Sequence, residues 1–542
     1  MLKTGLRETA RITGYTAEGL GVCRIDGCAV FVPNAIRGEL YEISVTHVSR
    51  NSAHGKIDKI LEESPHRIPR ACPAAKLCGG CQYQHMDYDE ELSAKAQKVT
   101  DALNRIGGQH LEPVGITGAL EISGYRNKAQ YPVALKNGKP VAGFYQNRTH
   151  EVIPVRRCLI LPEIFDKARD VVIRWAEEDR VSVYDEQTGR GLLRHIYLRR
   201  GTVTGEIMVC LVVNGDSLPR TNRLIHALQR EIPGLASVLL SVNRKNTNVV
   251  LGEEFRTLWG RDWIEDELCG FRFRLSPRSF FQVNHDQAQR LYEKAVELAN
   301  LHGTETVLDL YCGTGTITLA LSRQAGKAVG VEIIPQAIED ARQNAIRNGV
   351  ENVEFFCADA KIAAERLCAE GANPDVIVVD PPRKGLAPEV IDAMVTMAPA
   401  RIVYVSCDPA TLARDVKLLS EKGYTLTHAE AFDLFPRTFH VETVVQLVRK
   451  NPDMTVDVTL NLEDADLTAS EAKATYDQIK AYVLETFGLR VTSLQIAQTK
   501  RKLGLPTGEH YNLSQKENQV IPNCPPEKEA AIRETLRYFR MM

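Results

Sequence analysis

From about residue 300 onward, the chain alternates short apolar runs with longer segments in which apolar positions recur at helical spacing. The runs are rich in Val, Ile and Leu and are bounded by Gly, Pro or Asp, as is typical of buried strands. Such an alternation predicts an α/β fold with a doubly wound parallel sheet that helices cover on both faces. The predicted strands are TVLDLYC, KAVGVEII, VEFFCAD, DVIVVDPP, RIVYVSCDP and VETVVQLVRK, beginning at Thr306 and ending at Lys450.

Residues 1–65 carry shorter strand patterns separated by Gly and charged residues. This spacing predicts a small antiparallel β-barrel, of the kind found in OB-like domains. Such barrels often bind oligonucleotides, although others only pack against a neighbouring domain. The pattern alone leaves both roles open.

The middle of the chain, residues 66–270, has a mixed pattern. It follows a Pro- and Cys-rich stretch, SPHRIPRACPAAKLCGGCQYQH, that is too irregular for one element. A polar helix is predicted over 89–106, and Gly107 and Gly108 end it. The remainder favours strands with scattered helices, so we expect a central α+β domain.

Residues 451–542 extend the chain beyond the last predicted strand. Helices are expected over 470–488 and 526–540. A basic cluster at Lys500, Arg501 and Lys502 more often marks a solvated face than a binding site. No pattern in this extension points to a function.

The composition limits the class of protein. A length of 542 residues is enough for about three or four domains. Charged residues at 25% and apolar residues at 44% are ordinary for a globular protein. No apolar run reaches the ~18–20 residues of a membrane span, and the first residues lack a secretory signal, so we expect a cytoplasmic protein. With a net charge of −2, any contact with nucleic acid requires a local patch.

The first predicted βα turn, Asp309 to Gly315, is a candidate nucleotide site. Its glycines let a ligand approach the backbone beside a helix N-terminus. A dinucleotide fingerprint needs a third glycine where this chain has Thr318, which argues against NAD. Glu332 and Asp359 end the next two strands, where they could hold a ribose and an adenine edge. This arrangement favours S-adenosylmethionine, although each acid could instead cap the following helix.

The next strands end in residues that could react. Asp380 precedes two prolines, which hold its carboxylate at the mouth of the site. Cys407 ends the following strand just before a helix, whose N-terminus favours the thiolate. A buried, inert thiol is the alternative for this cysteine. Glu442 opens the last strand and supplies a carboxylate that could act as a base.

A cysteine, a base and a methyl donor fit the methylation of uracil at carbon 5. That carbon is too weak a nucleophile until a thiolate adds to carbon 6 and makes an enolate. A base must afterwards remove the proton from carbon 5, so that the thiol can leave. An N-methyltransferase, which the Asp-Pro-Pro element also suggests, needs neither group. Cys407 and Glu442 together therefore favour carbon methylation.

The Pro-rich stretch contains three cysteines within a span of ten residues, and a fourth cysteine follows far along the chain. Such thiols could hold a metal ion or an iron–sulfur cluster, and the spacing leaves zinc and iron–sulfur open. The candidate ligands are Cys72, Cys78, Cys81 and Cys158.

These motifs resemble those of the bacterial 23S rRNA (uracil-5-)-methyltransferases. The resemblance covers roughly residues 1–450 and lies in CGGCQYQH, SFFQVN, DLYCGTG, DPPRKG, SCDPATLARD and HVETV. It implies a TRAM domain, an RNA-binding barrel, at 1–65. It also implies a central iron–sulfur domain at 66–270 and a Rossmann-like class I methyltransferase domain at 271–450.

The resemblance also implies roles for single residues. Cys407 would be the nucleophile and Glu442 the base that removes the proton. The four cysteines would carry a structural [4Fe-4S] cluster. Residues expected to line the pocket for the methyl donor and the target base are Gln282, Tyr311, Glu332 and Asp380, with Thr316 and Asp359 contributing.

The expected substrate is a uridine of 23S rRNA, flipped out of a loop and methylated from S-adenosylmethionine by a monomeric enzyme. A tRNA uracil-5-methyltransferase is the nearest alternative. Many tRNA relatives lack the cysteine cluster, but some that carry it act on tRNA. A non-catalytic RNA-binding or ribosome assembly factor is the alternative from another class.

Overall fold

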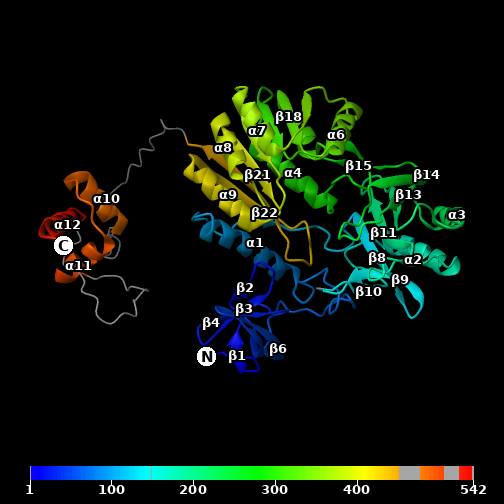
Figure 1. Cartoon of the computed structure of the whole chain (residues 1–542), viewed down its shortest axis with the longest axis horizontal. Helices are drawn as coiled ribbons and strands as arrows, with labels where there is room; N and C mark the ends of the chain where they lie inside the picture. The colour runs from blue at the N-terminus through cyan, green and yellow to red at the C-terminus, as the bar shows by residue number, and fades with distance from the viewer. Residues whose placement is uncertain (1, 148, 451–475, 504, 506–523, 540–542) are drawn as a thin grey trace. The chain divides into compact units, whose positions relative to one another are not determined.

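The computed structural model of the chain describes residues 2–147, 149–450, 476–503, 505 and 524–539. The chain divides into two compact units, residues 1–452 and 453–542, which are described separately (Figure 1). Within the described ranges, no helix is long and apolar enough to cross a membrane.

The N-terminal residues form a six-stranded sheet with the order β1-β5-β6-β4-β3-β2. Alternate side chains of β5 are buried, which places Tyr41, Ile43 and Val45 in one apolar core with Cys23 and Val30. The predicted short strands are thus confirmed, but β4 and β6 run parallel. The intervening β5 supplies the crossover that a parallel pair requires. The strands are β1 Arg7–Arg11, β2 Gly14–Tyr15, β3 Gly21–Ile25, β4 Cys28–Val32, β5 Leu40–Val48 and β6 Ser52–Glu62.

Helix α1, Tyr88–Arg105, matches the predicted polar helix to within one residue at each end. The side chain of Asp87 caps its N-terminus by accepting a hydrogen bond from the backbone N–H of Glu90 at 2.9 Å. Beyond it, a seven-stranded mixed sheet with α2 and α3 makes up the middle of the chain. Its elements are β8 Lys128–Lys136, β9 Lys139–Tyr145, β10 Val152–Pro154, α2 Glu163–Glu178, β11 Leu193–Arg200, β12 Ile207–Val213, α3 Thr221–Glu231, β13 Leu235–Val242 and β14 Glu254–Gly260.

An eight-stranded sheet follows, in the order β19-β18-β17-β20-β21-β23-β22-β7. Helices α4, α5 and α6 pack on one face, while α1, α7, α8 and α9 pack on the other, so the doubly wound prediction is confirmed (Figure 1). The elements are β7 Gly115–Thr117, α4 His285–Ala299, β17 Thr306–Leu310, α5 Thr316–Ser322, β18 Lys327–Glu332, α6 Pro335–Arg347, β19 Val353–Cys357, α7 Ala360–Ala369, β20 Val376–Val379, α8 Pro388–Met397, β21 Arg401–Ser406, α9 Pro409–Glu421, β22 Tyr424–Phe432 and β23 Glu442–Arg449. A separate hairpin, β15 Ile264–Leu268 and β16 Phe271–Leu275, precedes α4.

Strand β23 corrects the expectation of a fully parallel sheet. It runs antiparallel to both of its neighbours, β21 and β22. The link from β22 to β23 is a short loop without a helix, and a parallel return requires a longer crossover. β7 is a second difference, because it joins the sheet beside β22 from a distant part of the sequence.

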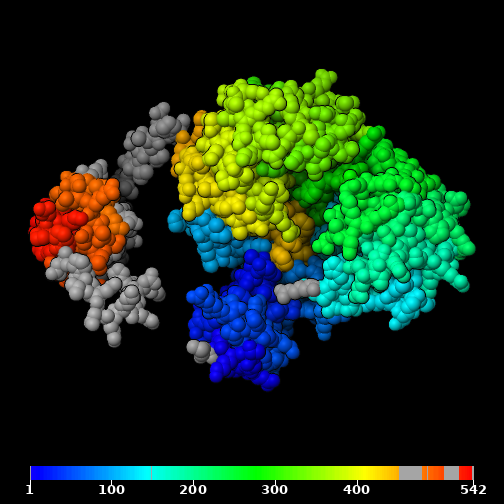
Figure 2. Space-filling model, in the orientation of Figure 1, coloured from blue at the N-terminus to red at the C-terminus, as the bar shows by residue number. Residues whose placement is uncertain are grey.

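Among the described residues, the second unit contains the helices α10 Tyr476–Phe487, α11 Ser493–Lys502 and α12 Pro526–Tyr538 (Figure 1), whose atoms are orange to red in Figure 2. They share an apolar core that includes Ile479, Ile496 and Ile532. The two helices expected here are confirmed where the structure describes them, and 470–475 and 540 lie outside the described residues. Lys500 is buried at the end of α11, so the basic run is not wholly a solvated face.

Candidate active site

The carboxyl ends of β17, β18, β20 and β21 meet at one edge of the eight-stranded sheet. Asp309 is fully buried there and accepts a hydrogen bond from Thr318 Oγ1 at 2.5 Å. The pKa of Asp309 is raised to about 7, chiefly by burial and also by the carboxylates of Asp380 and Glu332. Thr318, which stands where a dinucleotide site has glycine, therefore serves to hold a buried acid.

The turn after β17 is shaped by backbone conformations that few side chains adopt. Tyr311 has a φ of 74°, in the left-handed region, and Gly315 has a φ of 83°. A Cβ on Gly315 would lie 3.1 Å from the ring of Phe355, so a larger residue would crowd the turn. The backbone N–H of Gly313 donates to Glu332 Oε2 at 3.3 Å. The strained turn thus holds the backbone beside the acid that ends β18.

Asp359 lies at the N-terminus of α7, where its Oδ1 accepts the backbone N–H of Lys361 at 2.9 Å. The capping role that the sequence left open is thus realised for this residue. Burial raises the pKa of the Tyr311 hydroxyl to about 12, and the Asp359 carboxylate contributes to this shift. Asp359 therefore lies near Tyr311.

Tyr292 on α4 is a buried polar residue that the sequence reasoning missed. Burial raises the pKa of its hydroxyl well above the ordinary value, while the nearby side chains of Gln282 and Thr316 lower it. The hydroxyl thus lies between two predicted pocket residues. The only sequence signal was a tyrosine at an apolar position of a helix that follows SFFQVN.

Cys407 and Glu442 lie on neighbouring strand ends of the same edge. The pKa of the Cys407 thiol is raised to about 11, chiefly by burial and also by the carboxylates of Glu442 and Asp380, while Arg383 opposes them. The pKa of Glu442 is raised well above its usual value by burial and by Asp380. Cys407 and Glu442 therefore lie close enough to Asp380 and Arg383 for the charges of all four groups to interact.

The expectation that a helix N-terminus favours the Cys407 thiolate is wrong for the protein alone. Asp408 caps α9 and accepts the backbone N–H groups of Ala410 at 2.9 Å and Thr411 at 3.1 Å. These donors are turned toward the capping carboxylate. Burial and the nearby acids then outweigh the helix terminus, and the thiol stays protonated at neutral pH.

Side chains of α9 fix the loop that begins with Asp380-Pro-Pro. Asp415 is fully buried and accepts the backbone N–H of Leu386 and the hydroxyl of Tyr404, both at 2.8 Å. Arg414 donates to the carbonyl of Lys384 at 3.0 Å. The loop that carries Asp380 and Arg383 is thus tied to the helix that follows Cys407.

The loop that leads into Glu442 is held by a buried ion cluster that sequence reasoning also missed. Lys95 Nζ on α1 lies 2.7 Å from Glu91 Oε1 and 2.6 Å from Asp433 Oδ1, and all three side chains are fully buried. Glu91 Oε1 also accepts the backbone N–H of Arg437 at 2.6 Å. These bonds fix the segment between β22 and β23 against α1.

The cysteine-rich segment contacts the same loop. The backbone N–H groups of Gln82 and Tyr83 both donate to the carbonyl of Arg437, at 2.9 and 3.0 Å. Arg437 has a φ of 72°, so a bend in the left-handed region turns its carbonyl to these donors. The residues just after Cys81 are therefore joined to the loop that ends at Glu442.

The four candidate cysteine ligands lie near one another. Burial, with a contribution from the thiols of Cys81, Cys72 and Cys78, raises the pKa of Cys158 to about 12. In the described part of the chain, no group of three or more His, Cys, Asp or Glu side chains is placed to hold a metal ion. By its chemistry, a set of four thiols could serve a zinc ion or an iron–sulfur cluster.

His440 lies two residues before Glu442. Burial, with contributions from the cations Arg383 and Lys98, lowers its pKa to about 4. Its ring lies 4.3 Å from that of Phe439, and Lys98 donates to the Phe439 carbonyl at 3.1 Å. His440 is therefore neutral at pH 7.

Two family models match the chain. The model described as tRNA (Uracil-5-)-methyltransferase matches residues 238–450, and the TRAM domain model matches residues 2–57. An uncharacterized RNA methyltransferase of Clostridium tetani is 45% identical over 434 residues, which are 80% of this chain and 94% of that protein. Another, of Halalkalibacterium halodurans, is 44% identical over 441 residues, 81% of this chain and 96% of that protein.

A solved structure is also similar to this chain. It is the Pyrococcus abyssi tRNA (uracil-54, C5)-methyltransferase in complex with S-adenosyl-L-homocysteine. The identity is 30% and the TM-score 0.66, and the match covers 82% of this chain and 100% of that one.

Proposed function

Because the chain belongs to the family of S-adenosylmethionine-dependent RNA (uracil-5-)-methyltransferases, with their class I fold and N-terminal TRAM domain, we propose that it methylates carbon 5 of a uridine in 23S rRNA through a covalent adduct on Cys407. The observation that carries this proposal is the pairing of Cys407 with Glu442 beside Asp380 at one sheet edge. An N-methyltransferase needs neither the thiol nor the base.

The proposed reaction uses two groups of this chain, Cys407 and Glu442. Cys407 Sγ releases its proton to water and bonds to carbon 6 of the flipped uracil, which makes carbon 5 nucleophilic. Carbon 5 would then take the methyl group of S-adenosylmethionine, which would leave as S-adenosylhomocysteine. Glu442 then takes the proton of carbon 5, and the electrons of that bond expel the thiolate of Cys407.

The charges around Cys407 and Glu442 affect how readily each residue reacts. Arg383 lowers the pKa of the Cys407 thiol and so favours its ionisation. The raised pKa of Glu442 makes it a stronger base once it is ionised. Gln282, Tyr311, Thr316, Glu332, Asp359 and Asp380 are proposed to line the pocket of the methyl donor and the base.

The covalent step is tested with two variants and one control. Cys407→Ala should abolish both methyl transfer and the covalent RNA adduct. Glu442→Gln should leave the adduct trapped, because release requires removal of the carbon 5 proton. Cys357→Ala, which removes an exposed thiol at the end of β19, should behave as the wild type. Methyl transfer by the Cys407→Ala enzyme would overturn the mechanism.

The choice of rRNA over tRNA rests on the cysteine cluster, and tRNA is the second candidate. The similarity to a tRNA (uracil-54, C5)-methyltransferase favours tRNA. Mass mapping of total rRNA and tRNA from cells that lack this protein separates the two. Loss of one 5-methyluridine from 23S rRNA is expected, and loss from tRNA alone would transfer the proposal to tRNA. Either substrate implies a cytoplasmic site of action.

We also propose that Cys72, Cys78, Cys81 and Cys158 hold a [4Fe-4S] cluster with a structural role. The nearness of the four side chains supports this proposal, because the Cys72 thiol raises the pKa values of Cys78, Cys81 and Cys158. Protein prepared without air should be brown and contain about four irons per chain. A colourless protein that contains zinc would contradict the assignment.

A further inference from the structure

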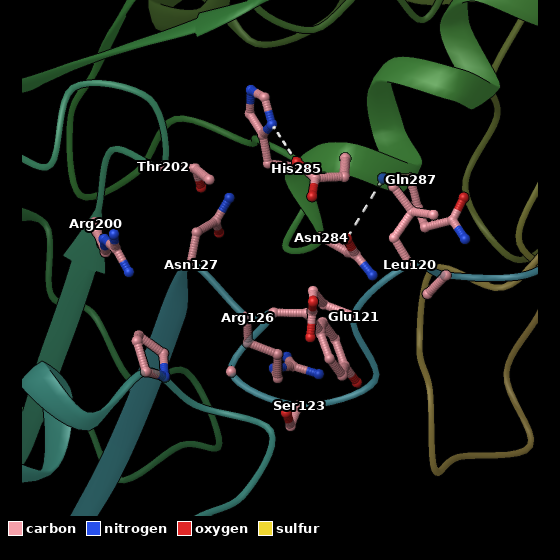
Figure 3. Close-up of a pocket in the computed structure, with 15 residues that line it drawn as sticks. Leu120, Glu121, Ser123, Arg126, Asn127, Arg200, Thr202, Asn284, His285 and Gln287 are labelled. Atoms are coloured by element: carbon pink, nitrogen blue, oxygen red, sulfur yellow. Dashed lines mark hydrogen bonds and ion pairs between the residues drawn. The ribbon is translucent and has the colours of Figure 1, made fainter. Parts of the chain in front are cut away.

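A second pocket lies next to the proposed reaction site, and the reaction does not use it. Its volume is about 140 Å³. A cavity of about 150 Å³ can hold benzene, so this volume suits one six-membered aromatic ring such as that of a pyrimidine base. Four segments line it: the loop before β8, Pro162 ahead of α2, Arg200 and Thr202 after β11, and the first turn of α4 (Figure 3).

Two buried amides at this pocket have one side-chain atom engaged and one without a partner. Asn127 is 3% exposed, and its Nδ2 donates to the carbonyl of Gln282 at 2.8 Å, while its Oδ1 has no partner. Asn284 is 4% exposed, and its Oδ1 accepts the backbone N–H of Gln287 at 3.4 Å, while its Nδ2 has no partner. The engaged atoms fix which way each amide is turned.

The two free atoms are of opposite kinds. Asn127 Oδ1 is an acceptor, and Asn284 Nδ2 is a donor. A buried polar atom without a partner destabilises a fold, so such atoms indicate a ligand or an ordered water. The edge of every nucleobase presents donors and acceptors side by side, and asparagine amides commonly pair with them.

The cations at the pocket suit the rest of a nucleotide. Arg126 and Arg200 both line it, and Arg200 lies at the end of β11 (Figure 3). A guanidinium can bind a phosphate or stack on the face of a base. Glu121 and Asp286 also line the pocket, so it is not a site for a highly charged anion.

The pocket is joined to the proposed reaction site by direct bonds. Asn127 fixes the backbone of Gln282, one of the residues proposed to contact the methyl donor or target base. Tyr125, two residues earlier, donates from its hydroxyl to the carbonyl of Pro436, in the loop that leads to Glu442. One short segment thus borders both sites.

We propose that this pocket binds the unstacked base of a nucleotide next to the target uridine, with Asn127 and Asn284 on its edge and Arg200 on its phosphate or ring. This inference rests on the proposed RNA methylation. Sequence-specific RNA recognition commonly spreads several bases of a loop into separate pockets. The pocket therefore helps to select which uridine is methylated.

The test combines kinetics with direct binding. Asn284→Ser keeps a capping oxygen for α4 but removes the free amide nitrogen, and Arg200→Gln removes the cation. Asn300→Ser at the other end of α4 and Arg256→Gln on the exposed β14 are the matched controls. With total RNA from cells that lack the protein, the two pocket variants should raise the KM for RNA roughly tenfold, while the KM for S-adenosylmethionine stays unchanged.

Saturation-transfer NMR with AMP, CMP, GMP and UMP, in the presence of S-adenosylhomocysteine, supplies the second readout. At least one nucleotide should give a signal with the full-length wild type and the Asn300→Ser control, but not with Asn284→Ser. Normal methyl transfer with an unchanged RNA KM, and no signal lost in Asn284→Ser, would mean that the pocket holds only water. Nucleotide signals without any methyl transfer to RNA would instead contradict the proposed function, while nucleotide binding by the pocket would still be supported.

Discussion

At the scale of single residues, the site depends on charges held away from water. Asp309, Asp380 and Glu442 all have pKa values raised by burial, so the sheet edge gathers acids that resist ionisation. Arg383 is the cation that offsets them at Cys407 and Glu442. The chemistry of the edge should therefore be sensitive to this one arginine.

Arg383→Gln should move the pH profile of kcat/KM. The reactive form of Cys407 is the thiolate, so the rate rises with pH until the pKa of about 11 is reached. Without Arg383 that pKa rises, so the thiolate is scarcer and the rate at pH 7 falls roughly tenfold. Stopped assays from pH 6 to 9 measure the profile. Arg366→Gln on α7 is the control. An unshifted pH profile for Arg383→Gln would contradict the role of Arg383 in lowering the pKa of Cys407.

Thr318→Val should destabilise the fold. Asp309 would keep its buried position but lose the hydroxyl that donates at 2.5 Å. An unpaired buried acceptor costs about 1–3 kcal/mol, which urea unfolding can measure. Thr318→Ser retains the hydroxyl and should unfold near the wild-type midpoint. Equal midpoints for Val and Ser would show that the bond contributes nothing.

Residue-scale prediction from sequence gave the right position for side chains at strand ends, while the roles of those side chains stay predictions. Asp380 and Cys407 follow apolar runs, and the carboxyl ends of parallel strands meet at one edge. It failed for Tyr292 and Lys95, whose roles come from partners far away in the sequence. A lysine on a polar helix is expected in water, and nothing local shows that Asp433 lies against it.

At the scale of elements, the direction of a strand in the sheet was harder to predict than its presence. The apolar runs predicted β17 to β21, and α1 was placed to within one residue. The antiparallel course of β23 was missed, because an apolar run has the same pattern in either direction. β7 was missed because three residues carry no usable period.

The element that positions Glu442 is the loop between β22 and β23, and α1 holds it. Lys95→Met should leave Glu91 and Asp433 buried without their cation, which costs about 3–5 kcal/mol. Thermal unfolding should therefore begin at a markedly lower temperature. Lys422→Met, which breaks a partly exposed pair with Asp392, is the control and should unfold like the wild type. A small effect of Lys95→Met would mean that the loop is held by its backbone bonds alone.

At the scale of the whole molecule, the two units have separate apolar cores. The relatives of Clostridium tetani and Halalkalibacterium halodurans match 80% and 81% of this chain but 94% and 96% of their own length. A shortened protein of residues 1–450 should therefore fold and transfer methyl groups to RNA. Circular dichroism and a radiolabelled methyl-transfer assay test this. Loss of folding in the shortened protein would show that residues 451–542 support the first unit.

The ion cluster on α1 also has a consequence for biosynthesis. Lys95 and Asp433 are separated by 338 residues in the sequence. At the usual ~5–20 residues added each second, a ribosome needs about 20 to 70 s to cover that distance. During this interval the nascent helix carries a lysine and a glutamate whose final surroundings have not yet been synthesised. Chaperones that shelter emerging chains are thus expected to meet this segment before the catalytic sheet can receive it.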